Sequence, residues 1–150
     1  MSDMSFEDIL NQPLADIQAP KALPIGTYLG IIDGQAEFVK LGQNQTDAVQ
    51  LNIKPIRAVK VDEKQLAEVL NGADLSDKKI RHRLFITNDS KHRLKAFFED
   101  HLGLPGGLTV KQAVAESMGK QVVIELGHQS SADGTQIYNS IKSTANVNTL

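Results

Sequence analysis

Alternating apolar and polar positions predict that much of this chain is β-strand. Val49 and Leu51, for example, alternate with polar residues in a run that Pro55 interrupts, and we expect a bulge or an exposed edge there. The first apolar run predicts one strand, or two strands with a break near the turn signal at Asp33 and Gly34. The strands predicted in this way span residues 25–41, 48–61, 80–87, 120–128 and 135–143.

Apolar residues at helical spacing predict three short helices between these strands. Asp62 with Gln65, and Thr109 with Gln112, have the spacing of capping boxes, which begin helices. Gly103 follows the longest helical pattern and predicts its end. The three helices are expected at about residues 62–70, 90–102 and 109–118.

The order of these elements predicts an α+β fold. A mainly antiparallel, curled β-sheet, or a small barrel of the oligonucleotide-binding (OB) type, with two or three short helices accommodates this order. We expect a partly extended N-terminal arm over residues 1–24, where three prolines prevent a long helix, an OB-like domain over residues 25–144 and a polar tail over residues 145–150. The helices of residues 90–102 and 109–118 should cover one opening or face. The predicted core contains Phe38, Leu94, Phe97, Phe98, Val122, Ile124, Ile137 and Ile141.

Composition and charge restrict the function classes. The chain contains no cysteine, which excludes disulfides and thiolate sites, and its net charge is −2. Residues 78–95 nevertheless carry seven Lys or Arg against a single acid, Asp89, while residues 1–20 carry four acids and no Lys or Arg. Such a local basic patch can attract a polyanion. No apolar run approaches the ~18 residues of a membrane span, and the acidic N-terminus is no signal peptide, so we expect no membrane partner and an intracellular location.

Sequence templates for catalysis are absent from the chain. No phosphate-binding glycine loop, nucleophile motif or zinc-binding histidine pair occurs. Glu125 and His128 are three residues apart, but on a strand their side chains would point to opposite faces. We therefore predict a protein that is not an enzyme and that needs no cofactor and no metal.

The strand predicted at residues 80–87 has one unusual face. Arg81, Arg83 and Phe85 share the side opposite an apolar face, and Tyr138 and Lys142 share the non-core side of the last strand. Two further strands present Tyr28, which lies beside a glycine, and Lys54, which ends a polar stripe with Gln50 and Asn52. Cations that follow a backbone and rings on which bases stack are typical of single-strand binding. An ordinary solvated surface, with Phe85 packed under a helix, is the alternative for the same residues.

With these residues in hand, the chain resembles small phage-encoded, OB-fold-like proteins that bind single-stranded DNA or assist replication and recombination. The resemblance covers residues 23–143 and lies in the stretches LPIGTYLGII, RHRLFITNDSKHRLKAFFEDHLGL and GKQVVIELGHQSSADGTQIYNSIKS. It implies an OB-like fold, single-stranded DNA as the partner and the host cytoplasm as the location, with a homo-oligomer left open. The chain differs from that class in its ending, STANVNTL, which has no acidic tail, and in the absence of lysine from residues 42–47.

A second function class stays open from the sequence. A compact β-domain with a proline-bearing N-terminal arm also suits a phage virion structural protein of the capsid decoration or cement type. Its partners would be capsid proteins, and its location would be the virion. Arms of this kind gain affinity by becoming ordered on a neighbouring subunit.

Overall fold

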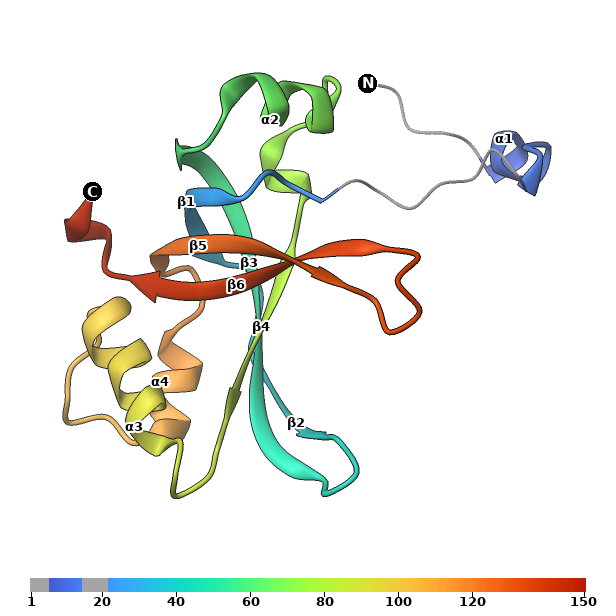
Figure 1. Ribbon diagram of the computed structural model, residues 1–150. Coiled ribbons are helices and arrows are strands. Elements are labelled where there is room, and N and C mark those ends of the chain that lie inside the picture. The colour runs from blue at the N-terminus through green and yellow to red at the C-terminus, as the bar shows by residue number, and fades with distance from the viewer. Residues whose placement is uncertain (1–5, 15–21) are drawn as a thin grey trace.

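The computed structural model of the chain describes residues 6–14 and 22–150. Residues 1–5 and 15–21 of the predicted arm therefore lie outside the described residues. Figure 1 shows the arrangement of the elements. The strands are β1 (Gly26–Ile32), β2 (Glu37–Leu41), β3 (Thr46–Lys60), β4 (Ile80–Phe85), β5 (Gln121–Ser130) and β6 (Ile137–Ala145). The helices are α1 (Phe6–Leu10), α2 (Glu63–Leu70), α3 (Lys91–Lys95) and α4 (Val110–Glu116), with shorter helical segments η2 (Leu75–Asp77), η3 (Ala96–His101) and η4 (Val147–Thr149).

Within the described residues, six strands form one antiparallel, curled sheet in an α+β fold, as predicted. The order along the sheet is β2-β3-β1-β5-β6, and β4 pairs with the free side of β3. The long strand β3 pairs with β2 near its start and with β1 near its end. β4 and β6 therefore form the two ends of the curl, and they do not pair with each other in the described chain, so the barrel stays open.

Local sequence signals explain most element boundaries. The register of β1 against β3 shifts at Pro55, where Gly30 pairs with Pro55 but Leu29 pairs with Arg57, so the predicted bulge is present. The capping box of Thr109 and Gln112 is formed in both directions at the start of α4. The helix predicted at residues 90–102 begins as α3 and continues as the π-helical segment η3.

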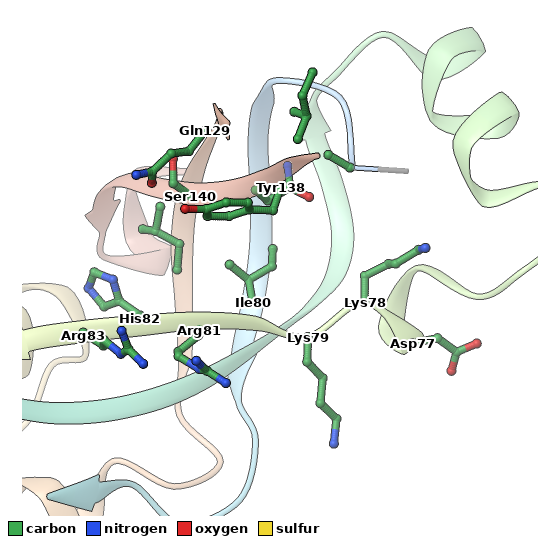
Figure 2. A pocket seen from close by; sticks show the side chains of 14 residues that line it. Asp77, Lys78, Lys79, Ile80, Arg81, His82, Arg83, Gln129, Tyr138 and Ser140 are labelled. Atoms are coloured by element: carbon green, nitrogen blue, oxygen red, sulfur yellow. The ribbon is translucent and has the colours of Figure 1, made fainter. Parts of the chain in front are cut away.

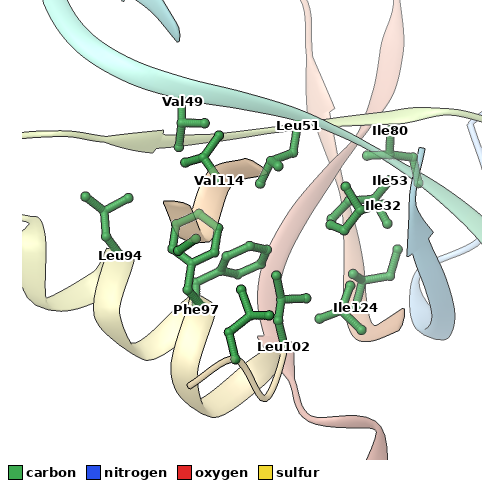
Figure 3. Packing of buried hydrophobic residues seen from close by; sticks show 14 of the residues in the cluster. Ile32, Val49, Leu51, Ile53, Ile80, Leu94, Phe97, Leu102, Val114 and Ile124 are labelled. Atoms are coloured by element: carbon green, nitrogen blue, oxygen red, sulfur yellow. The ribbon is translucent and has the colours of Figure 1, made fainter. Parts of the chain in front are cut away.

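The core fills the inside of the curl. Helices α3, η3 and α4 close one side of it, and Figure 3 shows their side chains packed against the strands. Five of the predicted core residues are buried as expected: Leu94, Phe97, Phe98, Val122 and Ile124.

Three predicted core residues differ from expectation. Ile141 is only partly buried, although it packs against the core. Ile137 is 56% exposed, because it lies at the start of β6, in the hairpin that extends beyond the core. Phe38 is 58% exposed on β2, because this short strand continues the sheet past the region that the helices cover.

The last residues assigned to the predicted arm pack against the rest of the fold. Leu23 and Pro24, assigned to the arm, are both buried. The backbone of Leu23 is held by the side chain of Asn139, which accepts from its N–H at 2.8 Å and donates to its carbonyl at 2.9 Å. His128 Nε2 reaches the same carbonyl at 2.7 Å. The chain is therefore fixed to the β5–β6 hairpin from Leu23 onward.

Candidate nucleic-acid interface

The two ends of the curled sheet are separated by a groove. This β4–β6 groove has a volume of about 930 Å³ and runs between the edges of β4 and β6. Its lining residues are Ala22, Asp77, Lys78, Lys79, Ile80, Arg81, His82, Arg83, Gln129, Ile137, Tyr138, Asn139, Ser140 and Ile141. Figure 2 shows Tyr138 and Ser140 on β6 across from Ile80 on β4. The groove exists because the barrel does not close between these strands.

The outer face of β4 carries a row of cations. Lys79 precedes the strand, and Arg81 and Arg83 follow at every second position, so neighbouring cations are about 7 Å apart along the chain. We call these three residues the β4 stripe. Figure 2 shows the two guanidinium groups on the side of β4 opposite Ile80 and His82, so they form the rim of the groove.

Phe85 continues the β4 stripe, as the sequence predicts. Its side chain is 48% exposed, so it does not pack under the following helix. It does not line the groove, however, and lies beyond Arg83 at the end of the strand. Tyr138, across the groove, is 47% exposed. Both rings therefore offer surface on which a flat group could stack.

The arginines of the β4 stripe are not neutralised by neighbouring acids. In the part of the chain that the structure describes, no ion pair joins Arg81 or Arg83 to a carboxylate. Arg83 Nε donates to Oε1 of Gln50 at 3.0 Å, which orients the guanidinium without cancelling its charge. Lys79 differs, since its amine lies 2.9 Å from Asp33. Within the β4 stripe, the two arginines are thus the cations that no described acid neutralises.

Lys54 lies beside the β4 stripe, on the neighbouring strand. The hydrogen bond from Lys79 holds the pKa of Asp33 below its usual range, and the positive charges of Lys79 and Lys54 add to this effect. Gln50 pairs with Arg83 and Asn52 with Arg81, so the predicted polar stripe of β3 runs next to the arginines. Lys54 does not line the groove itself.

Two predicted site residues are not part of this surface. Tyr28 is fully buried and donates its hydroxyl to the carbonyl of Pro24 at 2.7 Å, and burial raises its pKa to about 12. The space expected beside it, at Gly30, is occupied by Ile53 and Ile124. Lys142 is exposed, but its aliphatic chain packs over Gly127 of β5 and does not line the groove.

Several lining residues were not among those predicted. Lys79 could have been found, because it stands in phase with Arg81 and Arg83 at period two. Gln129 and Ser140 carry no such signal, since only the pairing of β5 with β6 brings them to the groove. The Ser140 hydroxyl oxygen is buried and has no hydrogen-bond partner among the described residues.

The inner wall of the groove contains a histidine with a strongly shifted pKa. His82 lies on the core side of β4, with its ring centroid 5.5 Å from that of Phe97. Burial and, to a smaller extent, the charge of nearby His101 lower the pKa of His82 to about 4. At neutral pH the imidazole is therefore uncharged, and the positive charge of the groove comes from Lys78 and the β4 stripe.

Other chemistry has little support among the described residues. No three His, Asp or Glu side chains in that part of the chain are placed to hold a metal ion. Glu125 accepts from Ser143 at 3.1 Å, whereas His128 is engaged with the backbone of Leu23. Across residues 6–14 and 22–150, no helix combines the length and apolar character needed to cross a bilayer. No protein-family model and no curated protein sequence matches this chain.

Proposed function

We propose that this protein binds single-stranded DNA along the β4 stripe and the β4–β6 groove, and that it does so without catalysing a reaction. The observation that carries the proposal is the pair of in-line arginines, Arg81 and Arg83, on an exposed strand face. Among the described residues, neither arginine has a carboxylate partner. Phosphate groups would lie on these guanidiniums, which form charge-assisted and often bidentate hydrogen bonds.

The exposed rings favour a single strand over a duplex. Phe85 lies at one end of the β4 stripe, and Tyr138 lines the groove across from Ile80. Base–aromatic stacking contributes about 1–3 kcal/mol per base, but it requires base faces that are not already stacked in a duplex. Gln129, exposed beside Tyr138 in the groove wall, supplies an amide that can hydrogen-bond base edges.

The resemblance to phage-encoded single-strand-binding proteins supports the same choice. It suggests DNA as the nucleic acid and an accessory role in phage replication or recombination. The open, curled antiparallel sheet is compatible with the OB-type platform on which such proteins bind their ligand. We propose that the strand lies on the rim and mouth of the groove, where the arginines of the β4 stripe and both rings are exposed.

Fluorescence anisotropy with a labelled oligo-dT of about 16 nucleotides tests this function, because one OB-type domain covers about 4–16 nucleotides. Two or three phosphate contacts predict that the affinity falls about tenfold between roughly 50 and 200 mM salt. A duplex of the same length should bind more weakly at each salt concentration. Absence of binding, or binding that ignores salt, would contradict the proposal and favour the virion structural role, which co-purification with particles would then examine.

A further inference from the structure

A second surface on the molecule has the properties of a docking site for an acidic, apolar helix. It is an open pocket of about 230 Å³ between α3–η3 and α4. Buried Leu94, Phe98 and Leu104 contribute to its apolar lining. The volume is smaller than the roughly 300–1,000 Å³ of clefts that hold cofactors or drug-sized ligands, so it suits two or three apolar side chains.

The wall of this α3–α4 pocket is apolar, and its rim carries charged side chains. Leu108 and Val110 contribute further apolar surface, and Val110 is 43% exposed. Lys91 and Lys95, one turn apart on α3, stand at the rim with Glu99. Lys95 is 3.9 Å from Glu99, which makes a loose ion pair, whereas Lys91 has no ion-pair partner within residues 6–14 and 22–150. The pocket therefore favours an apolar side chain followed or flanked by an acid.

Helix α1 of the same chain has the matching chemistry. Phe6, Leu10 and Leu14 are exposed to 77%, 65% and 87%, and Phe6 and Leu10, four residues apart, lie on one side of α1. Residues 1–14 contain the acids Asp3, Glu7 and Asp8 and no Lys or Arg. A five-residue helix is not stable on its own in water, so α1 needs a surface on which to pack.

We propose that α1 of one molecule docks in the α3–α4 pocket of a second copy of this chain, with Phe6 or Leu10 in the pocket and Glu7 near Lys91. In Figure 1, α1 and the α3–α4 pair lie on opposite sides of the molecule. A contact of this head-to-tail kind does not close on itself and joins copies into chains. The contact is independent of DNA and does not rest on the proposed function.

The absence of cysteine from the chain allows a direct cross-linking test. Leu10→Cys protein mixed with Val110→Cys protein should form a disulfide-linked dimer, because docking places the two positions against each other. The control partner is Phe38→Cys on β2, away from the pocket, where the residue is 58% exposed against 43% for Val110. Cross-linking to Val110→Cys should be about tenfold faster than to the control, which corresponds to a modest binding preference.

Two further variants decide between a second copy and the molecule's own arm. Lys91→Glu introduced into the Val110→Cys protein should remove most of the rate difference, since the rim would then repel Glu7. The double variant Leu10→Cys/Val110→Cys should give linked oligomers. Cross-linking within single molecules of the double variant, or equal rates with Val110→Cys and Phe38→Cys, would overturn the proposal.

Discussion

At the scale of single residues, the position of a residue on its strand decides whether its side chain is exposed on the surface. Arg81, Arg83 and Phe85 could be assigned to one face from sequence alone, because strand period two follows directly from alternation. Tyr28 could not, since its strand is buried on the side that faces the core and its neighbour Gly30 offers no open space. Which alternate face of a strand is solvated depends on the partners of that strand.

Substitution of Tyr138 tests the proposal that bases stack on the exposed rings. Tyr138→Ala should weaken binding of oligo-dT by about 1–3 kcal/mol and leave the salt dependence unchanged, because stacking releases few counterions. Phe85→Ala should behave in the same way. Phe38→Ala is the matched control. Phe38 is also exposed, but it pairs with Val49, so its side chain lies on the face of the sheet opposite the one that carries Arg83. Titrations by anisotropy at two salt concentrations measure both quantities, and an equal loss in the Phe38 variant would argue against stacking on Tyr138.

Gly30→Ala tests how closely β1 packs at Gly30, where open space for a ligand was expected beside Tyr28. A Cβ atom at this position would lie 2.6 Å from Cγ2 of Ile53. Gly30→Ala should therefore reduce the free energy of unfolding by about 1–3 kcal/mol through overpacking. Gly107→Ala is the control, because no atom lies within 4 Å of its added methyl group. Urea denaturation of both variants measures the difference. An unchanged midpoint for Gly30→Ala would contradict the prediction, because it would mean that β1 and β3 can move apart without loss of stability.

At the scale of elements, start and stop signals were the most reliable part of the sequence. The capping residues, the bulge at Pro55 and the turn at Gly134 all stand where the residue types predict them. The extent of the core was harder to predict. Ile137 and Phe38 look like core residues by type, but their strands run beyond the area that the helices cover, which no local pattern indicates. The groove could not be predicted for the same reason, because it depends on how β4 and β6 are placed by the whole sheet.

Helix α4 allows the capping interpretation to be measured. Thr109→Ala removes the side-chain acceptor for the N–H of Gln112 and should lower the free energy of unfolding by about 1 kcal/mol. Thr109→Ser retains the hydroxyl and should change stability by much less. Thermal unfolding followed by circular dichroism distinguishes the two variants. Equal stability of the Ala and Ser variants would mean that packing of Ala113 and Val114 alone determines where α4 begins.

At the scale of the whole molecule, the pKa of His82 links folding to pH. Its folded-state value of about 4 lies below the ordinary value of 6.5, so between these limits the unfolded chain binds a proton that the folded chain does not. Stability contributed by neutral His82 is complete above pH 6.5 and declines as the pH falls toward 4, by on the order of 3 kcal/mol. His82→Gln should flatten this part of the pH profile in urea denaturation. An identical slope in the variant would contradict the assignment.

The central claim is that Arg81 and Arg83 neutralise phosphates of a single strand. The most direct measurement is the salt dependence of oligo-dT affinity for Arg81→Ala, Arg83→Ala and a control, Arg93→Ala, whose arginine is exposed on α3 outside the groove. Each of the first two variants should reduce the slope of log affinity against log salt by about 0.7, the value for one lost contact to a single strand. Arg93→Ala should keep the slope of the unmodified protein. Unchanged slopes for Arg81→Ala and Arg83→Ala, or the same reduction in all three variants, would contradict the account.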